Sequence, residues 1–195
     1  VDDTYIMCKR FGALYSYHSA QGNRENEIWQ TTEHDLRHKL ALFAMDNKPT
    51  ILATLDADEW YMSPLTVKQI VEGMLRYDQY DTVLFRTVNF WNDEKHIKIF
   101  THDPNYARPR VWRVDPKASQ EPVGGLICTQ APDYVMGRRC AHMYNIFVGH
   151  TGYVSREVRF AKAKRYVQLG AGQWAREFLS EHHVHDWSVG AQLSG

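Results

Sequence analysis

Cysteine is scarce in this chain of 195 residues. Its three cysteines, Cys8, Cys128 and Cys140, include no C-x-x-C pair. An odd and sparse set of thiols excludes a disulfide-stapled scaffold and argues against a structural zinc site. The same scarcity favours a reducing compartment.

Long apolar runs and a net charge are missing as well. No signal-peptide pattern opens the chain, and no apolar run approaches the ~20 residues that a membrane-spanning helix needs. We therefore expect a soluble, cytoplasmic protein without a transmembrane segment, any membrane association being made through parts outside this chain. The 23 basic side chains balance the 23 acidic ones. Because this balance gives no general attraction for polyanions, nucleic acid is not an expected partner.

What the chain does contain is the material for one folded core. Hydrophobic residues make up 44% and charged residues 24%, as in globular domains, and the length fits a single domain over residues 1–195. Strands and helices alternate early, irregular strands follow, and helices close the chain. This order predicts an α/β fold with a mixed central sheet flanked by helices. The chain starts without an opening strand, as if its α/β domain were truncated at the N-terminus.

The hydrophobic pattern predicts the following elements. Helices are expected over residues 4–11, from Thr32 to the turn at 47–49, from Ser63 to Leu75, from Ser155 to Leu169 and over 174–181. Strands are expected over residues 13–17, 51–55, 82–90, 97–100, 110–113, 123–129 and 145–148. Ser63 followed by proline is a typical helix start.

Residues 50–60, T-I-L-A-T-L-D-A-D-E-W, concentrate acidic groups behind an apolar run. The run predicts a short buried strand, and period-two alternation would direct Asp56 and Asp58 to the same side of its carboxyl end. Two such carboxylates need water, a cation or a cationic side chain, because their desolvation is costly. In open α/β sheets, ligands bind at this end of a strand. Two interpretations follow: a divalent-metal site for a phosphorylated substrate, or a solvated strand-to-loop junction.

Three segments carry motifs in a matching order. The first is the D-A-D-E-W segment followed by Ser63 and Pro64, close to a strand-D-A-D-E-[WF] signature. The second is the start of the chain, which is similar to the tail of an S-T-D-G-T segment and reads V-D-D-T-Y-I-M-C-K-R-F-G-A. The third is similar to an H-x-G-Y-V segment followed by a basic helix and reads H-T-G-Y-V-S-R-E-V-R-F-A-K-A-K-R-Y. Together they resemble the family 2-like glycosyltransferases of the GT-A fold. The resemblance implies a Rossmann-like domain lacking its first βα unit, with a nucleotide and metal part in 1–60 and an acceptor part in 61–195.

The resemblance also implies an activity and a cofactor. Such enzymes transfer a sugar from a nucleotide-sugar donor (UDP-, GDP- or dTDP-linked) to a hydroxyl of a glycan or lipid-linked acceptor, commonly with inversion and with Mn²⁺ or Mg²⁺. Asp58, supported by Asp56, would hold the metal that neutralises the diphosphate leaving group. Asp56 is also a candidate contact of the nucleotide sugar. His150 is a further candidate ligand of the metal or the diphosphate. The alternative for His150 is a loop histidine bonded to the backbone.

Other residues match positions around the donor and acceptor. Arg37 falls where the family has an Arg-Asn pair, so it is a candidate nucleotide contact, although His38 follows it here. Trp60 is a candidate for stacking on a sugar ring. Arg110 and Trp112, in R-V-W-R, resemble an R-[LV]-[FW]-R strand that borders the acceptor, and Trp112 equally suits the core.

The chain departs from the family pattern at the position of the general base. Where many relatives have a His-Glu pair, this chain has Thr129 and Gln130, which are no bases near neutral pH. An inverting transfer needs a carboxylate or imidazole near the acceptor hydroxyl. Asp133, Glu59 and Glu121 are the candidates, and a turn role suits Asp133 as well.

Two other functions remain open from the sequence. One is a degenerate GT-A domain that binds carbohydrate or a partner without turnover. The other is a metal-dependent phosphoryl-transfer enzyme or nuclease that uses Asp56 and Asp58 differently.

Overall fold

The computed structural model describes residues 27–56, 58–100, 107–122, 131–168, 170 and 172–187, except the side chains of residues 27–33 and 36. The elements predicted over 4–11, 13–17 and 123–129 lie outside these residues, as do Cys8, Cys128, Thr129 and Gln130. Within the described ranges, no helix is both long and apolar enough to cross a membrane.

Seven strands form one sheet in the described part of the chain. They are β1 (Ile51–Ala53), β2 (Glu59–Tyr61), β3 (Thr82–Phe90), β4 (His96–Lys98), β5 (Ala107–Arg113), β6 (Cys140–His150) and β7 (Val184–Asp186). The order is β1-β5-β3-β4-β7, with β6 beside β3 and β2 beside β6. The pair β3 and β6 is parallel, whereas the other described pairs are antiparallel. The predicted mixed α/β sheet is therefore confirmed.

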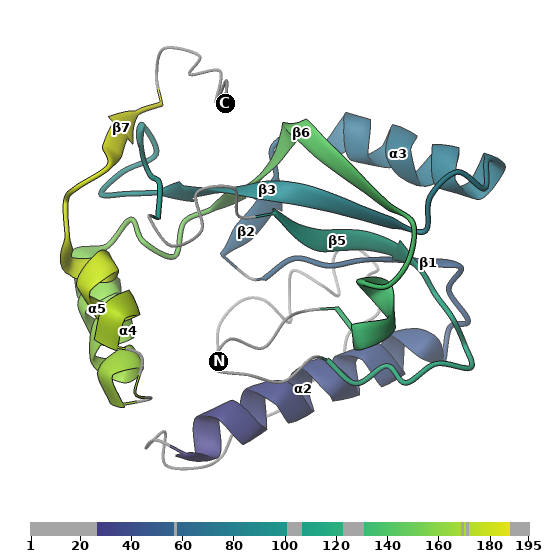
Figure 1. The fold of residues 1–195 in the computed structure, drawn as a ribbon, viewed down its shortest axis with the longest axis horizontal. Helices are drawn as coiled ribbons and strands as arrows, with labels where there is room; N and C mark the ends of the chain where they lie inside the picture. The colour runs from purple at the N-terminus through teal and green to yellow at the C-terminus, as the bar shows by residue number, and fades with distance from the viewer. Residues whose placement is uncertain are drawn as a thin grey trace, which may run out of the picture.

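The helices lie on both faces and at one end of this sheet. They are α2 (Glu27–Met45), α3 (Pro64–Arg76), α4 (Arg156–Gln168) and α5 (Gly172–Leu179), with a short 3₁₀ turn η1 (Asp133–Val135). In Figure 1, α3 covers one face of the sheet, α2 runs along the other, and α4 and α5 lie together near β7. The predicted N-cap at Ser63 with a proline at the helix start is confirmed.

The core explains why β3 is the centre of the molecule. Val67, Ile70 and Met74 lie on one face of α3, at helical spacing, and pack on Val83 and Phe85 of β3. Further residues of the same cluster come from β5 and β6. Because β3 is covered in this way, it fixes the position of its parallel neighbour β6.

Several predicted boundaries are wrong. The described helix α2 begins at Glu27, so Thr32 lies inside it and does not cap it. The strand predicted over 145–148 begins at Cys140 and ends at His150. Neither β2 nor β7 was predicted, because each has three residues and gains its ladder from a distant strand.

The acidic segment also differs from its prediction. The strand β1 ends at Ala53, and its residues are half-buried or exposed rather than fully buried. Asp56 and Asp58 therefore follow the strand and do not share its alternation. Tertiary contacts decide where each carboxylate points.

Candidate functional site

The pairing of β2 with β6 brings the D-A-D-E-W segment against the H-T-G-Y segment. Glu59 lies opposite His150 in this antiparallel ladder. The backbone N–H of Thr151 donates to the Asp58 carbonyl at 2.9 Å, and the Thr151 hydroxyl donates to the same oxygen at 3.2 Å. Two segments 92 residues apart are thereby fixed to each other.

Three charged or titratable side chains meet at this junction, and we call them the Asp58 cluster: Asp58, His150 and Lys162. His150 Nε2 lies 3.1 Å from Asp58 Oδ2, and Lys162 Nζ lies 3.9 Å from the same oxygen. On the other side of the imidazole, Nδ1 lies 2.9 Å from Oδ1 of Asn89, near the end of β3. A strand, a turn and a helix each contribute one member of the cluster.

Gly152 has no side chain, and the space that this leaves is occupied by the side-chain ends of the Asp58 cluster. A Cβ at this position would lie 2.4 Å from Asp58 Oδ2 and 2.5 Å from both His150 Nε2 and Lys162 Nζ. These separations are far below van der Waals contact, so any other residue would displace the three groups. The glycine of H-T-G-Y therefore permits this arrangement of the three side-chain ends.

The cluster favours the ionised form of Asp58. The hydrogen bond from His150 lowers the pKa of Asp58 to about 2, and the charges of His150 and Lys162 act in the same direction against partial burial. Burial lowers the pKa of Lys162, while attraction to Asp58, Asp56 and Glu59 opposes that shift. The carboxylate is thus a ready ligand for a cation.

The geometry of Asp58 and His150 fits a divalent metal ion. The contacts allow two protonation states of His150: a doubly protonated ring donates to Asn89 Oδ1 and to Asp58 Oδ2, whereas a neutral ring that donates from Nδ1 to Asn89 turns its Nε2 lone pair toward the carboxylate, an arrangement that a cation between the two groups satisfies. Neighbouring ligands of an octahedral ion with bonds of about 2.1 Å lie about 3.0 Å apart, and the two atoms here are 3.1 Å apart. No group of three or more His, Cys, Asp or Glu side chains gathers among the described residues.

Asp56 points to a different partner. Its Oδ1 lies 3.0 Å from Nη1 of Arg37 on α2, and both side chains are partly exposed. The structure therefore brings together two residues predicted to bind the nucleotide. Support of the metal by Asp56 remains a prediction.

Glu59 and Arg110 form a buried ion pair. Arg110 Nη2 lies 2.6 Å from Glu59 Oε1, with exposed fractions of 4% and 5% for the two side chains. Glu59 Oε2 also accepts the backbone N–H of Asp56 at 2.9 Å. These contacts favour a structural role for both side chains over the base and acceptor-binding roles predicted from sequence.

The remaining predicted residues are not members of the Asp58 cluster. Trp112 is buried and packs with Val135 of η1, which favours a core role over acceptor binding. Asp133 is exposed at the start of η1, and its role as base remains a prediction. Trp60 is 37% exposed and stacks on Phe90 with a centroid distance of 5.4 Å, so an aromatic surface is available beside the D-A-D-E turn.

Sequence reasoning missed two residues of the site. Asn89 is a polar residue in the otherwise apolar end of T-V-L-F-R-T-V-N-F, and that contrast was a usable signal. Lys162 carries no comparable signal, because it stands in the basic segment R-E-V-R-F-A-K-A-K-R-Y. Only the burial of Arg159 and Ala163 in the structure shows that this part of α4 is packed.

Comparison with known proteins does not decide the family. No model of a protein family matches the chain, and no curated protein matches it. The functional inference therefore rests on the geometry and on the motif resemblance.

Proposed function

We propose that this chain is a GT-A-type glycosyltransferase domain that moves a sugar from a nucleotide-sugar donor to an acceptor hydroxyl, with a divalent metal and with inversion. The observation that supports it most is the 3.1 Å approach of Asp58 Oδ2 and His150 Nε2. Both residues come from segments that resemble family motifs. Their meeting supports a common function for the two segments.

In this proposal the chain's own residues hold and orient the metal. Asp58 and His150 would be its protein ligands, and Asn89 would fix the imidazole ring by its bond to Nδ1. Mn²⁺ or Mg²⁺ accepts such oxygen and nitrogen ligands and takes its remaining positions from water and substrate phosphates. When bound, the ion would stabilise the negative charge of the nucleoside diphosphate leaving group.

The donor would extend from the metal toward α2 and β2. Arg37 and Asp56 offer a partly exposed guanidinium and carboxylate for hydrogen bonds with a nucleoside. Trp60 offers an exposed aromatic ring for an apolar sugar face. UDP-, GDP- and dTDP-linked sugars are the proposed donors, and a glycan or lipid-linked hydroxyl is the proposed acceptor.

A second function has one specific observation in its favour. Glu59, the acidic residue that directly follows Asp58, is held in the buried pair with Arg110 and is a poor base. A GT-A domain that binds a carbohydrate or a partner without turnover would keep the cluster and need no base. The two functions differ in turnover, and only the transferase requires nucleotide binding.

A thermal-shift experiment tests nucleotide binding. Mn²⁺ with UDP, GDP or dTDP, at about 100 times the dissociation constant, would add about 2.7 kcal/mol to the free energy of unfolding and raise the melting temperature by roughly 5–10 °C. We expect Asp58→Asn to abolish the shift. Asp46→Asn, at an exposed position after α2, is the matched control and should keep it.

Turnover then separates the two functions. Hydrolysis of a nucleotide sugar, or its transfer to an acceptor, would be measured with the wild-type protein and with Asp58→Asn. Turnover that the substitution removes supports the transferase, whereas a thermal shift without turnover supports the binding module. A folded protein that shows no shift with any of the nucleotides would reject the transferase, and binding of carbohydrate would then be tested separately.

A further inference from the structure

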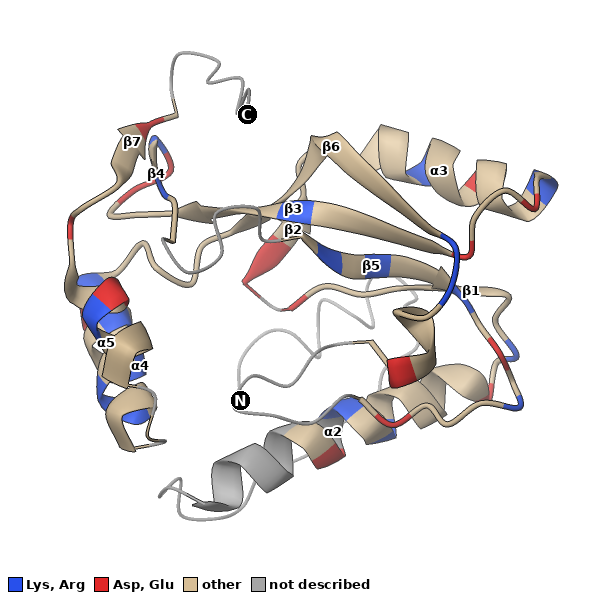
Figure 2. Ribbon diagram, viewed as in Figure 1, with Lys and Arg blue, Asp and Glu red and all other residues tan. Residues whose placement is uncertain are grey.

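One cation of the Asp58 cluster has no part in the function proposed above. Lys162 Nζ lies 3.9 Å from Asp58 Oδ2, and its side chain is only 28% exposed. Asp56 and Glu59 attract it in addition to Asp58. Figure 2 shows basic residues spread along α4, and Lys162 of that helix meets the acidic turn.

Packing holds Lys162 in this place. One turn earlier, the buried Arg159 donates from Nη1 to the Tyr153 carbonyl at 2.7 Å and lies 4.4 Å from the Trp91 ring, which fixes α4 against the body of the domain. The ammonium of Lys162 lies 4.3 Å from the centre of the Tyr153 ring. Because Gly152 has no Cβ, there is space for the ammonium to approach Asp58. The position of Lys162 beside Asp58 is therefore fixed by the packing of α4 and by its contact with Tyr153.

A metal ion and this ammonium need the same carboxylate oxygen. Asp58 Oδ2 faces His150 Nε2 and Lys162 Nζ together. A divalent ion held by Asp58 and His150 would repel the ammonium at such close range. The lysine has a flexible four-carbon stem, so its charged end can move while the stem keeps its packing. A diphosphate brought in with the metal would offer the displaced ammonium new negative oxygens.

From this geometry we infer that Lys162 is a built-in counter-ion of Asp58, which gives up the carboxylate when a metal ion binds and then binds a diphosphate oxygen of the donor. The inference rests on the proposed nucleotide-sugar function and adds a second role to the site. Lys162 disfavours metal binding alone and favours binding of metal and diphosphate together. The two ligands thereby become coupled, each raising the affinity for the other.

The test is one substitution with two binding readouts. Lys162→Met removes the charge and keeps an apolar stem. We expect it to tighten binding of Mn²⁺ alone about 2- to 5-fold, as expected for loss of a partly exposed ion pair, measured by electron paramagnetic resonance of free Mn²⁺. We expect it to weaken binding of inorganic pyrophosphate in the presence of Mn²⁺ about 10- to 100-fold, measured by calorimetry, because a charged hydrogen bond is lost.

Control variants isolate the effect of Lys162. Lys164→Met, at an exposed position two residues further along α4, should change neither affinity. Lys162→Gln removes the same charge and should give the same pair of opposite changes, so it replaces the methionine variant if that variant does not fold. Lys162→Arg keeps the charge and should retain most of the pyrophosphate affinity.

The outcomes separate this inference from the proposed function. If the wild-type protein binds neither Mn²⁺ nor pyrophosphate with Mn²⁺, the proposed function fails and the inference fails with it. If the wild type binds both, the function stands, and the inference is overturned when the neutral variants change only one affinity, neither, or both in the same direction. Opposite changes of the two affinities support it.

Discussion

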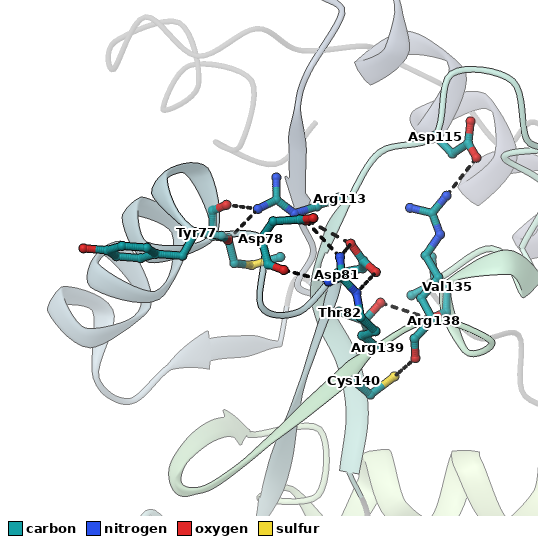
Figure 3. A network of polar contacts seen from close by, with 11 residues as sticks. Tyr77, Asp78, Asp81, Thr82, Arg113, Asp115, Val135, Arg138, Arg139 and Cys140 are labelled. Carbon is teal, nitrogen blue, oxygen red and sulfur yellow. Dashed lines mark hydrogen bonds and ion pairs between the residues drawn. The ribbon is translucent and has the colours of Figure 1, made fainter.

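Charged side chains gather at both ends of the parallel pair β3 and β6, but they are paired differently at the two ends. At the start of the strands lies the Arg139 network, which we define as Asp78, Asp81, Arg113, Asp115, Arg138 and Arg139 (Figure 3). At their end lies the Asp58 cluster, with His150 as the last residue of β6 and Asn89 near the end of β3. The same two strands position both sets of side chains.

In the Arg139 network, Arg139 and Arg113 each have more than one partner. Arg139 contacts Asp81 Oδ1 and Oδ2 at 3.0 Å and Asp78 Oδ1 at 2.9 Å. Arg113 donates to the carbonyl of Tyr77 at 2.9 Å and to that of Met74, so it also binds the carboxyl end of α3. Three aspartates face three arginines, which leaves the network without a net formal charge.

The Asp58 cluster is less complete. Its two partners, His150 Nε2 and Lys162 Nζ, meet one carboxylate oxygen, Oδ2, and 41% of the Asp58 side chain is exposed. Exposure alone does not separate the two sets, because Arg139 and Asp78 are 52% and 81% exposed. The difference is that carboxylates and guanidiniums balance one another in the Arg139 network, whereas two partners converge on one oxygen of Asp58. The comparison agrees with the general tendency of α/β sheets to bind ligands at the carboxyl ends of their strands.

Gly152→Ala is the substitution with the largest expected effect on this contrast. The added methyl group would push apart the three side-chain ends that meet at Gly152, and a misplacement of about 1 Å lowers affinity or rate about 100-fold. We expect loss of about 100-fold in Mn²⁺ affinity, with the fold retained because the displaced atoms are flexible ends. Gly172→Ala, where a Cβ meets no atom within 4 Å, is the control. Unchanged Mn²⁺ affinity in Gly152→Ala would contradict the metal site.

Asn89→Ala tests the support behind His150. Loss of the oxygen that accepts the Nδ1–H should free the imidazole ring and lower Mn²⁺ affinity about 10- to 100-fold, the usual effect of removing such a supporting residue. Titration calorimetry with Mn²⁺ measures it. Asn89→Asp keeps an acceptor and should retain more affinity, and Asn145→Ala, at an exposed position of β6, should have no effect. Equal affinities in all variants would remove His150 from the site.

Asp81→Asn addresses the structural end of the pair. The hydrogen bonds from Arg139 hold the pKa of Asp81 below its ordinary value of 3.8, with the charges of nearby arginines helping and burial opposing. We expect the substitution to lower the free energy of unfolding by about 1–3 kcal/mol at neutral pH, measured by urea unfolding.

The pH dependence of this effect has a definite sign. A carboxyl whose pKa is lowered by folding contributes stability above its unfolded pKa and loses it as the pH falls through the folded value. The difference between wild type and Asp81→Asn should therefore be constant near neutral pH and shrink below about pH 4. Mn²⁺ affinity should stay unchanged. A difference that grows in acid would show that Arg139 does not stabilise the carboxylate.

Arg37→Gln should have the smallest effect on stability. The pair with Asp56 is partly exposed on both sides, and such pairs contribute at most about 1 kcal/mol to the free energy of unfolding. In the proposed site the same change would weaken nucleoside diphosphate binding, measured by calorimetry with UDP, GDP and dTDP. A large loss of stability with unchanged nucleotide binding would place Arg37 with the structural residues instead.

Local pattern was sufficient for part of the fold and of the site. The apolar stripe of α3, its start at Ser63 and Pro64, and the β-prone run of β3 are local properties, and the structure has each of them where predicted. These features depend on neighbours in the chain. The choice of Asp58 and His150 as candidate ligands of one metal came from the family resemblance, and their approach depends on the ladder between β2 and β6.

Tertiary structure decided the rest. The strand β2 has three residues and exists through its ladder with β6, so no local pattern could predict it. Arg110 on β5 and Glu59 on β2 can be buried only because they pair with each other. The direction of Asp56 depends on Arg37 of α2, and the direction of Asp58 depends on His150 of β6 and Lys162 of α4. The physical reason is the same in each case: desolvating a charge is tolerable only beside a compensating partner. The sequence alone establishes that the D-A-D-E-W segment carries three carboxylates. Only the folded chain decided that Glu59 is held in a buried ion pair and that Asp58 is placed where it can bind a ligand.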